Sequence, residues 1–200
     1  MRALAGLGNP GSEYSRTRHN VGWMLLDRLR AAGKIVESRQ KESVQLERLK
    51  LGPVALWLIR PLSFMNNSGV GIAQACRMLS IVPADVLVTF DEIDLPLGTL
   101  RIRPAGGDAG HRGLGSVLEE LGTQQVPRLR LGVRGQGRRR DTAAYVLEPF
   151  DDTEVAELDE MLDRAVAAVR MILRRGLSTA MNTCNQRPKI ETTNPQETAD

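Results

Sequence analysis

The chain has 200 residues, of which 42% are hydrophobic and 26% charged, with a formal net charge of +3. This length is enough to bury one core and short of the usual length for two domains. No apolar run approaches the roughly 18 residues of a membrane span, and the first residues lack the apolar segment of a signal peptide. We therefore expect one cytoplasmic domain over residues 1–185 and a polar, disordered tail over 186–200.

The charges and the cysteines are unevenly placed. Residues 101–140 hold nine arginines and three acids, a local balance of +6, whereas residues 151–163 hold seven acids and no base. Arginine suits phosphate groups, so the basic stretch is compatible with a bound polyanion, although a solvated basic face is an equally good interpretation. Cys76 and Cys184 each lie in an apolar helical pattern, which predicts buried thiols rather than a disulfide or ligand pair.

Strands and helices are mixed along the chain. The patterns predict strands at 1–8, 43–51, 54–60, 86–90, 99–103 and 128–133, and helices at 21–32, 69–79, 114–121 and 155–173. Asn20 and Ser68 are expected as helix caps, and Gly176 as the end of the last helix. This order predicts a single three-layer α/β domain, with a mixed, mostly parallel twisted sheet flanked by helices. A basic loop is expected at 135–140.

The segment 6–11 reads GLGNPG and satisfies the G-x-G-x-x-G template after a strand. In a dinucleotide-binding unit the last glycine opens a helix, and an acidic residue follows about 20 positions later. Here a polar loop follows, and the residue twenty positions beyond Gly11 is Ala31. The context therefore argues against a dinucleotide site, although the glycines would let the backbone approach a ligand closely.

His19 is the candidate base. A lone histidine is more often structural, but Asp91 follows the apolar run 86–90 and Asn9 follows the first strand. If the two strands run parallel, both side chains reach one sheet edge beside His19. A carboxylate on one imidazole nitrogen would leave the other free to take a proton from water. His111 fits a structural role better, since Asp91 is expected to orient only one base.

The segment 64–69 reads FMNNSG and precedes the second predicted helix. With Ser68 as the cap, Asn66 is free to donate its amide to a substrate carbonyl or to the oxyanion formed from it. The chain contains no G-x-S-x-G, P-loop, H-E-x-x-H or cysteine–histidine motif. Water activated by a histidine, with neither metal nor cofactor, is the simplest chemistry that remains.

Several motifs in a fixed order resemble the bacterial-type peptidyl-tRNA hydrolase family over about residues 3–185. They are GLGNPG, Tyr14, TRHNVG, FMNNSG, DEIDLPLG, GHRGLG and RLRLGV. The resemblance implies a monomeric, metal-independent α/β enzyme that hydrolyses the ester between a peptide and the tRNA 3′ end, and so recycles peptidyl-tRNA released in translation. By position, His19 matches the family's general base and Asp91 the acid that orients it.

The resemblance also implies positions that contact substrate. Asn9 matches an asparagine that distinguishes blocked from free aminoacyl ends. Tyr14, Phe64 and Asn66 match substrate-contacting positions. The last two matching positions, Arg103 and Arg130, correspond to a basic pair suited to the tRNA 5′-phosphate.

The chain departs from the family at Arg112, where an asparagine usually helps to hold substrate and water. Arg112 is carried over as a substrate-binding position, but a guanidinium accepts no hydrogen bond, so reduced turnover is possible. The main alternative is a catalytically silent RNA-binding relative, and persistent RNA binding without hydrolysis would identify it. A dinucleotide-dependent enzyme is a distant third, which a NAD-induced rise in melting temperature would reveal.

Overall fold

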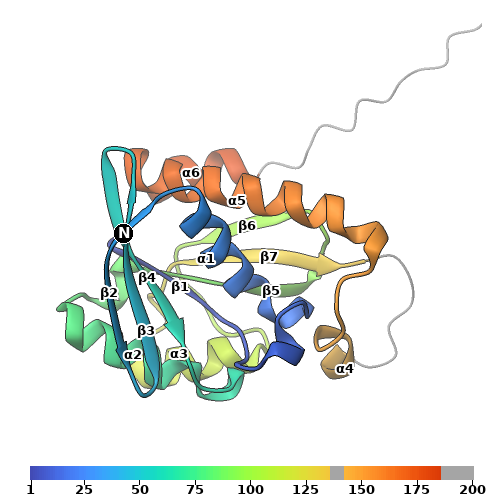
Figure 1. Cartoon of the computed structure of the whole chain (residues 1–200), viewed down its shortest axis with the longest axis horizontal. Helices are drawn as coiled ribbons and strands as arrows, with labels where there is room; N and C mark the ends of the chain where they lie inside the picture. The colour runs from blue at the N-terminus through green and yellow to red at the C-terminus, as the bar shows by residue number, and fades with distance from the viewer. Residues whose placement is uncertain (136–141, 186–200) are drawn as a thin grey trace, which may run out of the picture.

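The computed structural model describes residues 1–135 and 142–185. Its centre is one seven-stranded sheet with the strand order β2-β3-β4-β1-β5-β7-β6 (Figure 1). The strands are β1 (Ala3–Gly6), β2 (Lys34–Lys41), β3 (Val44–Leu51), β4 (Val54–Pro61), β5 (Val86–Pro96), β6 (Leu100–Arg103) and β7 (Arg128–Arg134). The basic loop predicted at 135–140, apart from Gly135, and the tail predicted at 186–200 lie outside the described residues.

The sheet is mixed, as predicted. β1 pairs in parallel with β4 and β5, and β5 pairs in parallel with β7. The pairs β2–β3, β3–β4 and β6–β7 are antiparallel. Parallel pairs therefore equal antiparallel ones, so "mostly parallel" was wrong: β2 extends the predicted hairpin by a third strand, and β6 runs antiparallel to β7.

Helices cover both faces of the sheet and complete the three predicted layers (Figure 1). They are α1 (Val21–Ala31), α2 (Ser68–Leu79), α3 (Arg112–Leu121), α4 (Thr142–Val146), α5 (Val155–Arg175) and α6 (Leu177–Cys184). One hydrophobic core joins α1, α5 and α6 to the sheet, and a second core joins α2 and α3 to it. None of the helices in the described ranges is long and apolar enough to cross a membrane.

Three elements and one cap differ from the prediction. The patterns missed β2, whose residues are mostly exposed, and the short helices α4 and α6. Gly176 ends α5 with a φ of 85°, as predicted, and α6 begins at the next residue. The cap of α2 is Asn67, whereas Ser68 is fully buried as the first helical residue. Both cysteines are free thiols, with Cys76 buried and Cys184 partly buried.

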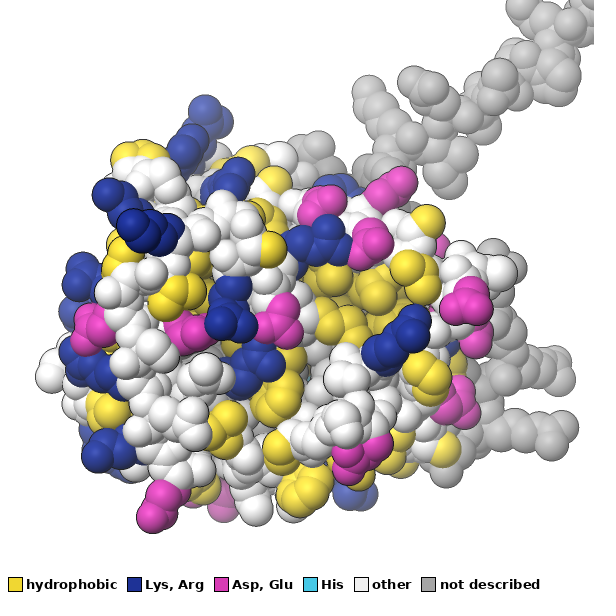
Figure 2. Space-filling model, in the orientation of Figure 1, with side chains coloured by type: hydrophobic (Ala, Val, Ile, Leu, Met, Phe, Trp, Pro, Cys, Tyr) yellow, Lys and Arg dark blue, Asp and Glu magenta, His cyan; other side chains and the backbone are white. Residues whose placement is uncertain are grey.

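A groove between α1 and α5 is the main hollow on the face shown in Figure 2, where hydrophobic side chains line it and charged ones surround it. Its volume is about 430 Å³, and its lining includes Met24, Leu158 and Leu162, with Arg28 among the polar residues. No histidine side chain is visible on this face of the molecule (Figure 2).

Candidate active site

Two glycines bring the turn that carries His19 onto the end of β1. A Cβ atom at Gly6 would lie 2.5 Å from the carbonyl oxygen of Gly22, and a Cβ at Gly22 would lie 2.5 Å from the carbonyl oxygen of Leu7. Such distances are below any van der Waals contact, so α1 crosses the sheet this closely only because both residues lack a side chain. The 3-10 turn Arg18–Asn20, directly before α1, is thereby held at the carboxyl end of β1.

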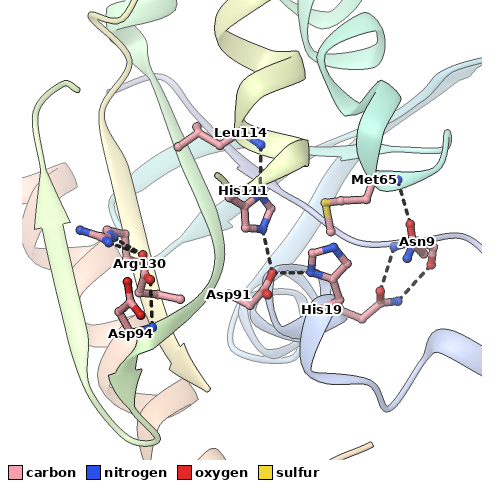
Figure 3. Close-up of polar contacts among 10 residues, drawn as sticks. Asn9, His19, Met65, Asp91, Asp94, His111, Leu114 and Arg130 are labelled. Atoms are coloured by element: carbon pink, nitrogen blue, oxygen red, sulfur yellow. Dashed lines mark hydrogen bonds and ion pairs between the residues drawn. The ribbon is translucent and has the colours of Figure 1, made fainter. Parts of the chain in front are cut away.

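Asn20 and Asn9 fix the loop that follows β1. The Asn20 side chain accepts a hydrogen bond from the Asn9 N–H at 2.8 Å and donates to the Asn9 carbonyl at 3.0 Å. Asn20 thus occupies the predicted cap position of α1, but its side chain makes no capping bond. The Asn9 Oδ1 accepts from the Met65 N–H at 2.8 Å, which leaves its Nδ2 as the group available to donate into the cavity that Asn9 lines (Figure 3).

Asp91 holds His19. The Nδ1 of His19 lies 2.8 Å from Oδ1 of Asp91 (Figure 3). Asp91 lies within β5, which continues to Pro96 rather than ending at residue 90, but it is two positions beyond Thr89, the last residue paired with β1. Asp91 therefore meets His19 at this edge of the sheet, as predicted. Because the carboxylate accepts from Nδ1–H, Nε2 of His19 is left as the proton acceptor.

His111 binds the same carboxylate oxygen, at 2.9 Å from its Nε2. Its Nδ1 accepts a hydrogen bond from the Leu114 N–H at 3.1 Å, so His111 is the side-chain cap of α3. An Nδ1 that accepts leaves the proton on Nε2, which donates to Asp91. The cap agrees with the structural role expected for His111, and with both ring nitrogens occupied His111 is not a second base, although it shares the carboxylate oxygen with His19. The position of His111, three residues before Leu114 at a helix start, was the signal that could have revealed this cap.

Asp91 stays ionised in this arrangement. It is 3% exposed. Burial alone would raise the pKa of its carboxyl group, but the electrostatic attraction of His111 and the hydrogen bonds from His111 and His19 outweigh burial and hold the pKa well below its usual range. A buried carboxylate that accepts from Nδ1 of His19 can stabilise the positive charge that this ring carries while it holds a proton taken from water.

These residues line a cavity of about 600 Å³. The predicted site residues Asn9, His19, Phe64, Asn66, Asp91 and Arg112 all lie on its wall, together with His111, Asp94, Asp108 and residues of α4. Tyr14 is not in the lining; its ring meets the exposed Phe64 edge-on, with 6.4 Å between ring centres. Within residues 1–135 and 142–185, the Arg112 guanidinium makes no hydrogen bond or ion pair, so its charge is free to meet a ligand.

Arg103 and Arg130 lie together in a second cavity of about 210 Å³, which also touches Glu92 and Arg128. Nε of Arg130 donates to Glu92 at 2.5 Å, whereas Arg103 is exposed. Arg128 is buried and donates to the carbonyls of Gly107, Gln124 and Val126. Burial, together with the charge of Arg130, lowers the pKa of Arg128. Arg128 thus holds the loop that contains Gly107 in place. Arg103 and Arg130 remain the candidates for binding a phosphate.

The three converging side chains also have the composition of a metal site, since ligand atoms of His19, Asp91 and His111 lie within 4.8 Å of one another. The fit is poor. A metal on Nε2 of His111 would shift the proton to Nδ1, which would then face the Leu114 N–H that it now accepts from. Both imidazoles also aim at one carboxylate oxygen. The arrangement suits shared hydrogen bonds better than a metal ion.

Comparison with known proteins shows one family over almost the whole length. A family model described as peptidyl-tRNA hydrolase matches residues 3–193. The peptidyl-tRNA hydrolase of Symbiobacterium thermophilum is 44% identical over 187 residues, covering 92% of this chain and 98% of the relative. That of Pseudothermotoga lettingae is 39% identical, covering 92% and 97%. The crystal structure of the Acinetobacter baumannii enzyme matches with a TM-score of 0.84 and 28% identity, covering 92% and 94%.

Proposed function

Because the chain belongs to the peptidyl-tRNA hydrolase family, we propose that it cuts the ester bond between a peptide, or another N-blocked aminoacyl group, and the tRNA 3′ end. The observation that carries the proposal is the 2.8 Å contact between Nδ1 of His19 and Asp91. It fixes the imidazole in the form that can take a proton at Nε2. The comparisons offer no support for the catalytically silent alternative.

His19 deprotonates a water molecule, which attacks the ester carbonyl carbon. The proton moves to Nε2, and the buried Asp91 carboxylate stabilises the resulting imidazolium. The tetrahedral intermediate collapses, the bond to the tRNA 3′ oxygen breaks, and that oxygen takes the proton from Nε2 of His19, which returns the imidazole to its neutral form. The products are a free peptide acid and tRNA with a free 3′ hydroxyl. His111 is a positioning residue in this scheme, since it holds Asp91 from the other side at 2.9 Å.

The amide groups on the cavity wall bind the substrate. Asn66 is exposed on the wall and donates to the oxyanion. Asn9 presents Nδ2 to the acyl group, because Met65 occupies its Oδ1. Blocked and free aminoacyl ends differ in charge, and a neutral amide donor suits the carbonyl of a blocked end better than an ammonium group. Phe64, with Tyr14 behind it, and Arg112 are the further substrate contacts.

Arg103 and Arg130 bind the tRNA 5′-phosphate in the second cavity. This assignment is supported by the position of both arginines, which share one cavity with the buried Arg128, next to the catalytic cavity along β5. Phosphate would then compete with Glu92 for Arg130. We assign the hydrolase domain to residues 1–185, and we propose that it works as a cytoplasmic, metal-independent monomer that recycles tRNA from peptidyl-tRNA released in translation.

The test is release of N-acetyl-amino acid from purified N-acetyl-aminoacyl-tRNA in the presence of chelator, with unblocked aminoacyl-tRNA as the control substrate. We expect the wild-type protein to cleave only the blocked substrate, and His19→Ala to lose roughly 10²- to 10⁴-fold in rate. Cleavage that chelator abolishes would contradict the metal-free mechanism. Tight tRNA binding with no cleavage by the wild-type protein would overturn the hydrolase assignment itself.

A further inference from the structure

We propose that Arg18 is a positioning residue: its buried guanidinium fixes the α4 wall of the catalytic cavity against the turn that carries His19. The proposal rests on the proposed function for its kinetic consequence, but its structural part concerns the free protein. Arg18 is 3% exposed, which is rare for an arginine. A charge this deeply buried is costly unless many partners compensate it.

The residues after α4 supply hydrogen-bond and ionic partners of Arg18. Its backbone N–H donates to the Glu148 carbonyl at 3.0 Å, and its guanidinium donates to the Pro149 carbonyl. A terminal nitrogen lies 2.6 Å from Oε2 of Glu154. Beside these contacts, Thr17 forms an isolated antiparallel bridge with Pro149. The chain around His19 and the chain after α4 are thus tied by backbone, side-chain and ionic contacts at once.

Two aromatic rings lie close to the guanidinium. Its central carbon lies 4.3 Å from the centre of the Tyr145 ring and 5.2 Å from that of Phe150. Tyr145 belongs to α4, and its hydroxyl donates to the Val133 carbonyl and accepts from the Gly135 N–H. Arg18 therefore contacts α4 directly as well as the residues after it, and Tyr145 links both to the end of β7.

This attachment matters because α4 is a wall of the catalytic cavity. Thr142, Ala143 and Val146 of α4 line it, as does Leu147 next to the helix. A helix of five residues is too short to be stable by itself, so its position depends on tertiary contacts. His19, the residue after Arg18 in the chain, lines the same cavity. One side chain therefore ties the turn that carries the base to the α4 part of the cavity wall.

A lysine should not replace this arginine. A planar guanidinium can contact two rings while it donates to a carbonyl and a carboxylate in different directions, which a single ammonium group does less well. Arg18→Lys keeps the charge and so avoids an unpaired Glu154, which makes it the most conservative test. Arg28→Lys is the matched control. Arg28 also forms ion pairs with α5, through Asp159 and Asp163, but it lies in the groove between α1 and α5, outside the catalytic cavity.

The experiment compares wild type, Arg18→Lys and Arg28→Lys by hydrogen exchange and by kinetics on N-acetyl-aminoacyl-tRNA. The informative amides are those of Leu147 and Glu148, which donate to the carbonyls of Ala144 and Tyr145. In Arg18→Lys we expect these amides to exchange at least about tenfold faster and KM to rise about tenfold, with kcat changed less than about threefold. The pH profile should be unchanged, because His19 and Asp91 remain paired. Arg28→Lys should match wild type in all of these.

Exchange rates and KM in Arg18→Lys equal to those of Arg28→Lys would overturn the proposal. So would a loss confined to kcat, because Arg18 would then act on His19 rather than on the wall. If Arg18→Lys does not fold, Glu154→Gln removes the charge of the ion pair, keeps an acceptor for the Asp151 N–H that Glu154 caps, and should raise the same exchange rates to a smaller extent. The exchange measurement needs no substrate, so it tests the positioning role even if the wild-type protein proves inactive on this ester.

Discussion

The side chain of Asn20 makes two hydrogen bonds to the backbone of Asn9. Its oxygen accepts from the Asn9 N–H at 2.8 Å, and its nitrogen donates to the Asn9 carbonyl at 3.0 Å. Both residues are nearly fully buried. These two bonds join the residue after His19 to the loop after β1, and so set the distance between the base and the Asn9 amide. Asn20 holds two substrate-facing groups in register without lining the cavity itself.

The first prediction is that Asn20→Ala impairs catalysis more than stability. The variant loses two hydrogen bonds and leaves buried backbone groups unpaired, which costs about 1–3 kcal/mol. Asn185→Ala is the matched control, since the Asn185 side chain makes the same pair of bonds to Ile102 at the edge strand β6. We expect urea unfolding to show similar losses for both variants. Only Asn20→Ala should lose kcat/KM, by roughly 10- to 100-fold.

Equal kcat/KM for Asn20→Ala and Asn185→Ala would show that the Asn20–Asn9 contact serves folding alone.

The second prediction separates the two roles of His111. Asparagine is among the best helix caps, so His111→Asn should keep the cap of α3 but is too short to reach Asp91. We expect His111→Asn to lose the stability that the bond to Asp91 contributes and its kcat to fall by about tenfold or more, since the buried carboxylate loses one of its two donors. His111→Ala should lose the same activity and, because the cap of α3 is also removed, about 1 kcal/mol more stability. Steady-state kinetics and thermal unfolding measure the two effects separately.

Wild-type kcat in His111→Asn would contradict a role for His111 in orienting Asp91, and would leave the cap of α3 as its function.

The third prediction concerns acid. The pKa of Asp91 is lowered in the folded protein, against an opposing effect of burial, chiefly by His111. A carboxyl group with a lowered folded pKa adds stability above its unfolded pKa of about 3.9, and that contribution is lost as the pH falls through the folded pKa. In Asp91→Asn this contribution is absent. The difference in unfolding free energy between wild type and Asp91→Asn should therefore be largest above pH 5 and shrink as the pH falls to 3.

Urea unfolding at pH 6, 5, 4 and 3 measures this difference for the two proteins. A difference that stays constant over this range would mean that Asp91 does not hold its charge in the folded state more readily than in the unfolded chain. A difference that grows in acid would reverse the sign that we expect.

The sequence predicted the parts of the fold that depend on periodic burial. The stripe of apolar residues in α5 and the glycine–proline turn between β3 and β4 are local patterns, and both elements lie where they were expected. β2 was missed because most of its residues face solvent, and α4 because its position depends on the contact between its own Tyr145 and the distant Arg18. Such contacts join residues more than 100 positions apart, which no local pattern records.

The residues of the site were likewise predictable where they depend on local sequence, and not where they depend on tertiary contacts. His19 and Asp91 were inferred from residue type and from their places after strands, and they meet as expected. His111 was expected to be structural and does cap α3, but its contact with the same oxygen of Asp91 that holds His19 was not foreseen. The shared oxygen depends on where α3 begins relative to β5, a tertiary relationship. The unusual residue of this chain, Arg112, was visible in the sequence, but its unpaired state required the structure.

The last prediction addresses Arg112 itself. It is exposed at the first position of α3, lines the catalytic cavity, and has no hydrogen-bond or ion-pair partner in the part of the chain that the structure describes. Because a guanidinium accepts no hydrogen bond, it cannot hold a water molecule through the water's own proton, whereas an asparagine oxygen can.

We expect Arg112→Asn to raise kcat several-fold with little change in stability, since surface changes usually stay within about 0.5 kcal/mol. Arg112→Ala removes the charge without adding an acceptor and should not raise kcat. Steady-state kinetics on N-acetyl-aminoacyl-tRNA would distinguish the two. An equal gain in both variants would identify the positive charge as the obstacle, and a loss in both would identify Arg112 as a substrate contact that this chain uses in place of the asparagine.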